Sequence, residues 1–439
     1  MERPADAGTH AQPAAVPPEH AVPGAEQVES GPFDVGKAVR FSVANFGAQA
    51  VFTLFTTGMS LYLESYRIRP ELIGLLSNER ALVAAIAQPI VGRMSDRTRT
   101  RLGRRRPFFL VGIPAISIAL ALLALHPPFW IMLGVMTIAA FFLWVALDPY
   151  NAMLADIFPP SHRGKVGGIL GLSQMLGSIV FLLFAISFWE SNEPLVFGVT
   201  IAVLLLSFGF TFFTVKEPPL NSQAEERAAR PPKLTPIAYI RELLAYKEAA
   251  KYTLALAFFW IGNGGATPFL TLFGTHALGA NSSEVFFLPL AFVVTTAIFA
   301  VPAGFLADRI GRKRVLTFGL FIFGVGAIIG SQSATLIQGT IALAFIGIGN
   351  AGIGTMLIPF LADLIPRSRT AELIGISSAV TSFAQPVGSV LAGGIVSLAT
   401  GMVGLNDAYR WSFIFAGAMI VLGGLFLQLV RPEQFVQES

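Results

Sequence analysis

Residues 304–314 read GFLADRIGRKR, so that a glycine, an acid and four basic residues directly follow a long apolar segment. A related pattern occurs 212 residues earlier, where residues 92–97 read GRMSDR and residues 103–106 read GRRR. A second pair of sequences, LADIFP at residues 154–159 and LADLIP at residues 361–366, is separated by 207 residues. Two independent motifs at nearly the same separation indicate that the chain consists of two similar halves in parallel orientation.

The composition is that of a membrane protein. Of the 439 residues, 54% are hydrophobic and only 13% are charged, and the mean hydropathy is +0.67. A soluble domain carries about 25% charged residues, so this composition excludes a disordered protein, a fibrous protein and an ordinary soluble enzyme. The chain lacks cysteine and its five histidines are scattered. We therefore expect no catalytic residues, no metal site and no bound cofactor.

Twelve segments are apolar enough, over about 20 residues each, to cross a bilayer as helices. They cover residues 37–63, 71–93, 106–125, 129–154, 165–189, 194–214, 248–275, 284–307, 314–332, 335–361, 371–400 and 409–430. We predict an all-α membrane protein in which twelve transmembrane helices form two pseudo-symmetric six-helix bundles. The bundles comprise residues 33–214 and 248–430, and residues 215–247 link them. Residues 1–32 contain no apolar run and predict a disordered tail, and residues 431–439 predict a short second tail.

The basic residues are concentrated in alternate loops. Of the 30 Lys and Arg residues, only Arg67, Arg69 and Arg410 fall in loops on the other side. Because loops rich in Lys and Arg stay in the cytoplasm, we expect both tails and the linker to be cytoplasmic in a multi-pass protein of the plasma (inner) membrane. This topology explains the arginine-rich run at residues 93–106 without a nucleic-acid partner. The expected partners are the lipid bilayer and a small-molecule substrate, and we expect a monomer.

The repeated loops resemble a family signature. Residues 304–314 are similar to the pattern G-x-L-A-D-R-x-G-R-K of the major facilitator superfamily. This resemblance implies a secondary transporter in which two bundles rock about a substrate site near the middle of the bilayer. One alternative is an exporter of drugs or other metabolites with the same fold, which the 38 phenylalanines favour. A more remote alternative is a receptor or scaffold that does not transport, against which the intact loops of both halves argue.

The first loop is longer and resembles a narrower group. Residues 88–108 read QPIVGRMSDRTRTRLGRRRPF and are similar to QPxVGxxSDRxxSRxGRRRPF of the sucrose/H⁺ symporters, which lie close to the glycoside–pentoside–hexuronide:cation symporters. Residues 149–156, PYNAMLAD, are similar to their PCRALLAD. The resemblance implies a sugar or glycoside as substrate and H⁺ as the coupling ion. Ala84 and Gln88 stand where sodium-coupled relatives carry two acids, and Asn151 stands where the sucrose symporters carry arginine.

The two loops, with the acids that end the fourth and tenth segments, make a candidate cytoplasmic gate. Its residues are Gly92, Asp96, Arg97, Gly103, Arg104, Arg105, Arg106 and Asp156 in the first half, and Gly304, Asp308, Arg309, Gly311, Arg312, Arg314 and Asp363 in the second. We expect the glycines to let helices approach closely. We expect Asp96 and Asp308 to accept hydrogen bonds from the N-terminal amides of a helix.

The arginines of the gate are expected to pair with Asp156 and Asp363. Such pairs would hold the outward-facing state shut and break as the protein opens inward. Alternatively, the arginines only set the topology or bind lipid headgroups.

Charged residues inside the predicted helices are costly and therefore mark functional sites. Glu79 and Arg80 lie in the second segment, and Asp148 lies in the fourth. A lone carboxylate in a low-dielectric cavity is able to take up a proton. Asp148 is therefore the first candidate for proton coupling and Glu79 the second. The alternative for Glu79 and Arg80 is that they pair with neighbouring helices and fix the packing.

A sugar site needs polar groups and an aromatic platform, because a sugar presents hydroxyls and an apolar C–H face. The predicted helices supply the substrate-binding candidates Asn45, Gln49, Arg80, Trp144, Asn151, Gln174, Trp260, Asn263, Asn350 and Gln385. The spacing of Trp144, Asp148 and Asn151 places these three on one helix face. The alternative for each polar residue is a hydrogen bond between neighbouring helices.

Overall fold

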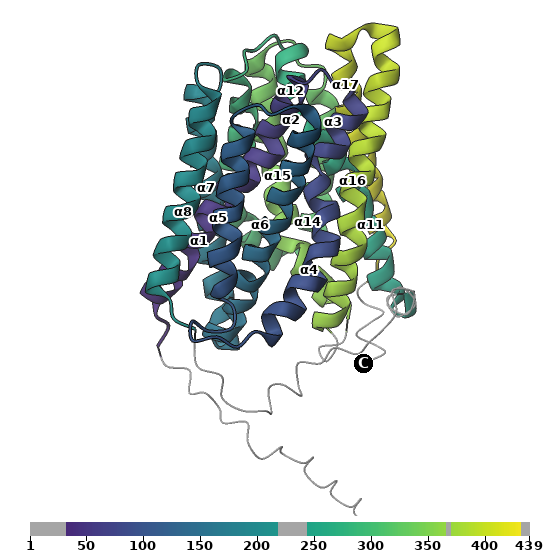
Figure 1. Cartoon of the computed structure of the whole chain (residues 1–439). Coiled ribbons are helices and arrows are strands. Elements are labelled where there is room, and N and C mark those ends of the chain that lie inside the picture. Colours follow the sequence, from purple (N-terminus) through teal and green to yellow (C-terminus); the bar gives the residue numbers. More distant parts are fainter. Residues whose placement is uncertain (1–31, 218–243, 366–369, 432–439) are drawn as a thin grey trace, which may run out of the picture. The chain divides into compact units, whose positions relative to one another are not determined.

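The computed structural model describes residues 32–217, 244–365 and 370–431, and within these ranges the chain is almost entirely helical. Asp34–Ser439 is one compact unit, shown in Figure 1. The predicted N-terminal tail up to residue 31, most of the predicted linker and the tail after Arg431 lie outside the described residues.

The first half folds into helices α1 to α8. Their bounds are α1 Val35–Thr53, α2 Met59–Glu64, α3 Pro70–Ser77, α4 Glu79–Arg97, α5 Pro107–Leu123, α6 Phe129–Ile157, α7 Pro160–Phe188 and α8 Glu193–Thr214. A π-helical turn, Leu54–Gly58, joins α1 to α2. Local chemistry sets several of the starts. The side chain of Asp34 accepts a hydrogen bond from the Lys37 amide at 2.8 Å and caps α1. Proline occupies the first position of α3 and α5, where its missing N–H costs nothing.

The second half repeats this organisation in helices α11 to α17. Their bounds are α11 Lys247–Ala266, α12 Leu270–His276, α13 Phe287–Ile310, α14 Arg312–Gly330, α15 Leu336–Ala362, α16 Thr370–Val403 and α17 Leu405–Gln428. Short 3₁₀ turns, Thr267–Phe269 and Glu284–Phe286, precede α12 and α13. Thr335 caps α15 by accepting a hydrogen bond from the Gln338 amide at 3.3 Å.

Among the described residues, nine helices are long and apolar enough to cross a membrane, three fewer than the twelve segments that we predicted. The three that fall short are nevertheless helical. The helix α5 has 17 residues. The first predicted span is interrupted by the π-helical turn. The second is interrupted at Asn78, after which α4 begins with the charged pair Glu79 and Arg80. The interruptions therefore mark where the chain places polar groups within the bundle.

The two halves pack by the same pattern. In the first half α1 packs against α7 and α8, α6 against α4 and α5, and α5 against α8. In the second half α11 packs against α16 and α17, α15 against α13 and α14, and α14 against α17. Each contact of one half thus has its counterpart in the other. This correspondence gives two pseudo-symmetric six-helix bundles, as the duplication of the sequence predicted.

The bundles meet along α3 and α4 against α16, and along α7 against α13. Figure 1 shows α4 beside α16. We call the end at which α4, α6, α13 and α15 finish the gate end, and the opposite end the far end. In the middle of the interface, Asn78 Nδ2 donates to Ser389 Oγ at 2.5 Å. Nearer the far end, Thr271 Oγ1 donates to the carbonyl of Thr57 at 3.1 Å.

The far end carries further contacts between the bundles. His276 Nε2 on α12 contacts a carboxylate oxygen of Glu64 on α2. The Glu190 amide donates to Ser283 Oγ at 2.9 Å. At Gly393 on α16 the backbones approach so closely that an added Cβ would lie 2.7 Å from the Cα of Glu71. The structure therefore holds its two bundles together at the far end.

Because no Cβ fits between α16 and α3 at this point, the substitution Gly393→Ala is expected to push the bundles apart at the far end. Spin labels at Ser191→Cys and Asn281→Cys, in a chain without native cysteine, measure the separation by pulsed EPR. We expect a longer distance component in the Gly393→Ala variant. The control is Gly394→Ala, since no atom lies within 4 Å of its Cβ position. Identical distance distributions in the two variants would contradict the close packing.

Candidate functional site

A polar seam runs between α4 and α6, and Glu79 forms its first part. The Glu79 side chain is buried, with 8% of the residue exposed. Its Oε2 accepts a hydrogen bond from Thr137 Oγ1 on α6 at 3.3 Å. Its Oε1 is buried without a hydrogen-bond partner. A buried carboxylate with one unsatisfied oxygen is costly, so this group is not fully compensated by its surroundings.

Arg80 forms the second part of the seam, together with two aromatic rings. Its guanidinium carbon lies 4.2 Å from the centre of the Phe52 ring on α1. Phe52 meets Trp144 edge to face, with ring centres 5.9 Å apart, and Trp144 Nε1 donates to the carbonyl of Arg80 at 3.2 Å. Arg80 is 8% exposed and its Nε has no hydrogen-bond partner. The negative face of Phe52 therefore supplies part of the stabilisation that this buried cation needs.

Asp148 forms the third part, one turn after Trp144 on α6. The side chain of Gln88 on α4 donates a hydrogen bond to its carboxylate. Asp148 Oδ2 is buried and has no hydrogen-bond partner. Gln88 stands at one of the two positions where sodium-coupled relatives were expected to carry an acid. In this chain the position therefore offers an amide to Asp148 instead of a second carboxylate.

Three other candidates make hydrogen bonds within their own bundle. Asn45 Nδ2 donates to the carbonyl of Leu170 at 3.3 Å and links α1 to α7. Asn350 Nδ2 donates to Thr296 Oγ1 at 3.4 Å and links α15 to α13. Asn263 accepts a hydrogen bond from Thr267 one turn later. These contacts have the geometry of helix packing, which was the alternative for each polar residue.

The remaining candidates lie apart from the seam. Gln49, Trp260 and Gln385 are half-buried, whereas Asn151 and Gln174 are exposed. The structure thus brings together Glu79, Arg80, Trp144 and Asp148, and it describes no contact between these four and the candidates of the second half.

Three residues of the seam were not anticipated from the sequence, namely Phe52, Thr137 and Gln88. Thr137 lies seven residues before Trp144 and Gln88 lies eight residues after Arg80, so helical spacing carries a signal for both. Phe52 has no such signal, because it is one of 38 phenylalanines and is identified only by its contacts with Arg80 and Trp144.

The gate of the first bundle is a dense ion-pair network. Arg104 and Arg105 contact the two oxygens of Asp156, each at 2.9 Å. Arg105 also contacts Asp96 at 2.9 Å and is almost buried, with its side chain 8% exposed. Glu217, which follows α8, accepts hydrogen bonds from the amides of Arg104 and Arg105 at 2.8 and 2.9 Å. Four side chains and the α8 terminus are therefore joined in one cluster.

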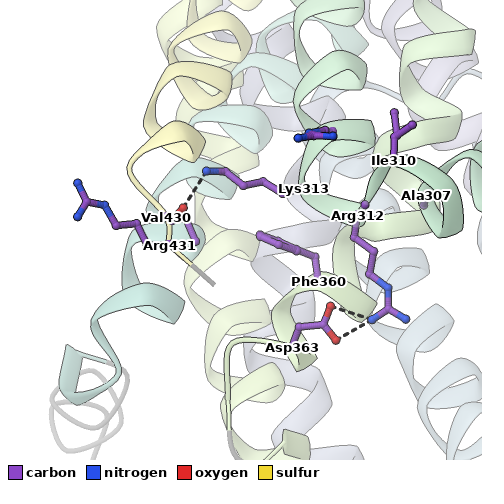
Figure 2. A pocket seen from close by; sticks show the side chains of 10 residues that line it. Ala307, Ile310, Arg312, Lys313, Phe360, Asp363, Val430 and Arg431 are labelled. Atoms are coloured by element: carbon purple, nitrogen blue, oxygen red, sulfur yellow. Dashed lines mark hydrogen bonds and ion pairs between the residues drawn. The ribbon is translucent and has the colours of Figure 1, made fainter. Parts of the chain in front are cut away.

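The gate of the second bundle is simpler and more exposed. One nitrogen of Arg312 contacts both oxygens of Asp363, at 2.7 and 2.8 Å, as Figure 2 shows. Their side chains are 43% and 45% exposed. The loops turn alike, because Gly103 and Gly311 have positive φ angles of 110° and 93°, a region that favours glycine. Arg312 therefore corresponds to Arg104 of the first bundle.

Other basic residues of the gate do not pair as we expected. Arg106 donates to the carbonyl of Phe212 and lies over its ring at 4.3 Å. Arg97, Arg309 and Arg314 are exposed. The ion pairs that form join helices of one bundle to its own loop, and neither cluster bridges the two bundles. The pairs therefore fix each loop to its bundle, in a structure whose bundles meet at the far end.

Two expectations about the gate are wrong. Asp96 and Asp308 lie in the last turns of α4 and α13 and so are not at a helix N-terminus, and the partner described for Asp96 is Arg105. Gly92 and Gly304 do not mediate close approach, since no atom lies within 4 Å of their Cβ positions. Close helix contacts occur instead at other glycines, among them Gly177, where an added Cβ would lie 2.2 Å from the carbonyl oxygen of Phe46.

The unequal burial of the two clusters predicts unequal stability effects. Asp156→Asn leaves the nearly buried Arg105 with only the exposed Asp96, and we expect it to cost about 2 kcal/mol of unfolding free energy. The matched change Asp363→Asn removes an exposed pair and is expected to cost about 0.5 kcal/mol. Thermal unfolding of the purified variants in one detergent measures both. Equal losses, or a larger loss for Asp363→Asn, would contradict the burial argument.

Comparison with known families and relatives places this geometry in context. A sequence model of the Major Facilitator Superfamily matches residues 41–290 and 252–438. An uncharacterised MFS-type transporter of Methanocaldococcus jannaschii is 23% identical over 372 residues, which cover 82% of this chain and 85% of the relative. The multidrug resistance protein MdtG of Klebsiella pneumoniae is 23% identical over 401 residues, which cover 87% and 91%.

Solved structures show the same fold at lower identity. A bacterial homologue of the human lysosomal transporter Spinster, in an inward-facing and occupied conformation, superposes with a TM-score of 0.69 at 17% identity, over 92% of this chain and 96% of the other. The nucleoside transporter NupG superposes with a TM-score of 0.68 at 15% identity, over 90% and 98%. At this identity the likeness shows the fold alone.

Proposed function

The chain belongs to the Major Facilitator Superfamily, and from this premise we propose that it moves a sugar or glycoside across the membrane together with H⁺. Its family consists of membrane transporters and not of enzymes. The proposal concerns the substrate, the coupling ion and the direction in which the bundles open. The observation that carries it is the α4–α6 seam, where two carboxylates and a guanidinium are buried among helices.

Asp148 supports proton coupling. A carboxylate that is buried in a low-dielectric site with one oxygen unsatisfied is stabilised by binding a proton, because the neutral acid both loses its charge and gains a donor. Gln88 contacts the carboxylate, and Pro149 directly follows Asp148 within α6. A proline frees the carbonyl of the preceding turn. Asp148 is thus able to alternate between charged and neutral forms without losing every partner.

The aromatic and polar groups of the seam support a sugar. Trp144 and Phe52 offer ring faces and edges for the apolar C–H face of a pyranose. Arg80 offers donors to hydroxyl oxygens, and Asp148 offers an acceptor. The loop at residues 88–108, which resembles that of sucrose/H⁺ symporters, supports the same substrate class.

The contacts at the far end support alternating access. The bundles are joined there by Asn78 with Ser389 and by Glu64 with His276, whereas the ion pairs described at the gate end stay within each bundle. If the gate end is cytoplasmic, as the arrangement of the basic residues predicts, this structure is closed to the outside. In this proposal both termini face the cytoplasm of an inner membrane.

A drug or metabolite exporter is the second candidate. The resistance protein MdtG is among the relatives of this chain, and the 38 phenylalanines would suit an aromatic cavity. The two candidates differ in the direction of proton movement relative to substrate, which transport assays separate.

The coupling role of Asp148 is tested with Asp148→Asn in proteoliposomes. We expect wild-type protein to accumulate labelled sucrose or maltose under an inward proton gradient and to lose this accumulation with a protonophore. The variant is expected to lose gradient-driven accumulation at least tenfold, while it still exchanges sugar across the membrane, because the amide retains hydrogen bonding but cannot release a proton.

The matched control is Asp407→Asn, which changes an exposed acid next to Arg410 and is expected to leave accumulation unchanged. Accumulation by Asp148→Asn at the wild-type level would refute the role of this carboxylate. Absence of uptake of either sugar, combined with proton-driven expulsion of a cationic dye, would favour the exporter.

A further inference from the structure

We propose that the gate end of the second bundle contains a binding site for a phosphate group, supplied by the headgroup of an acidic phospholipid. The site is a cavity of about 870 Å³ where four helix ends converge, the ends of α13, α15 and α17 and the start of α14. Figure 2 shows the side chains around it. The inference concerns a lipid and does not depend on which substrate the protein transports.

The charge of the cavity wall is strongly unbalanced. Its ten lining residues are Ala307, Ile310, Gly311, Arg312, Lys313, Arg314, Phe360, Asp363, Val430 and Arg431. Four of them are basic and one is acidic. The single carboxylate, Asp363, already contacts Arg312 through both oxygens. The lining therefore carries more positive charge than its own acid balances, and an anion in the cavity would be stabilised.

The start of α14 adds to this imbalance. Three basic residues, Arg312, Lys313 and Arg314, occupy its first turn, and no side chain caps its N-terminus. The N-terminus of a helix carries a partial positive charge, so basic residues there are unfavourable and a bound anion is favourable. The helix end and its side chains thus act in the same direction.

The first bundle shows what this kind of turn binds. The sequence Gly103-Arg104-Arg105-Arg106 corresponds to Gly311-Arg312-Lys313-Arg314, and both glycines have positive φ angles. In the first bundle a carboxylate is already in place, because Glu217 accepts hydrogen bonds from the amides of Arg104 and Arg105.

The second bundle differs at the segment that would supply this acid. The chain after α8 reads Val215-Lys216-Glu217, whereas the described chain after α17 ends with Val430 and Arg431. The wall thus gains a base where the first bundle contributes an acid. The same turn with more positive charge and a cavity beside it points to an anion from outside the chain.

The chemistry of the wall suits a phosphodiester in a membrane. Arginine donates in a planar fork that matches phosphate oxygens, and basic pockets beside a bilayer attract acidic lipids. Lys313 donates to the carbonyls of Gln428 and Val430, which holds its charge at the wall. On α13, Phe305 and Leu306 are exposed next to the cavity lining, and such apolar groups suit the acyl chain of the same lipid.

The test uses the full chain in mixed micelles, titrated with phosphatidylglycerol or with phosphatidylcholine, and follows thermal unfolding. We expect phosphatidylglycerol to stabilise the protein in a saturable way and phosphatidylcholine to have no such effect. The double variant Arg314→Gln with Arg431→Gln is expected to weaken the apparent affinity for phosphatidylglycerol by about tenfold or more. The matched control, Arg93→Gln with Arg101→Gln, removes two exposed charges from the gate end of the first bundle and is expected to keep the affinity.

A parallel titration with glycerol 3-phosphate distinguishes the two sources of phosphate. Saturable stabilisation by glycerol 3-phosphate, equal to that by the lipid and lost in the same double variant, would support the phosphate site and assign it to a soluble ligand. Equal affinity of wild type and double variant for phosphatidylglycerol would overturn the proposal. An equal loss in the control variant would also overturn it, because the effect would then come from general surface charge.

Discussion

The interior of a bilayer offers no hydrogen-bond partners, and this constraint governs where the chain places its polar groups. The helices satisfy their own backbones, so side-chain charges within the bundle need specific partners. Glu79, Arg80 and Asp148 meet this requirement only in part, through Thr137, the Phe52 ring and Gln88. Each retains one buried polar atom without a hydrogen bond. A membrane protein that keeps three such groups together has a site that a substrate or a proton can complete.

Duplication of a six-helix unit explains both the symmetry of the molecule and its differences. The packing pattern is shared by the two halves, and so are the glycine turns and the arginine–aspartate pairs of the gate. The halves diverge where side chains specialise. The first holds the buried seam and a dense gate cluster, whereas the second has an exposed gate pair beside a basic cavity. Function in this fold therefore resides in residues that break the repeat.

The sequence predicts the fold well because the repeated motifs and apolar segments each depend on local composition. The breaks at Leu54–Gly58 and at Asn78 were not predicted, because hydropathy does not detect them. Within the seam, Arg80 and Asp148 stand out as charges in apolar helices, whereas Phe52 becomes visible only through tertiary contacts. The roles expected for Asp96, Gly92 and Gly304 failed for the same reason, since a motif names residues but does not fix which helix faces them.

The most direct test of H⁺-coupled sugar transport is the movement of protons that a sugar gradient drives. Proteoliposomes with wild-type protein and no imposed pH gradient are exposed to sucrose or maltose, while an external indicator records the pH. A symporter predicts that sugar entering the vesicles carries protons with it, so that the external medium becomes more alkaline until a protonophore abolishes the signal. Sugar uptake without a pH change, or proton release into the medium during uptake, would contradict the mechanism.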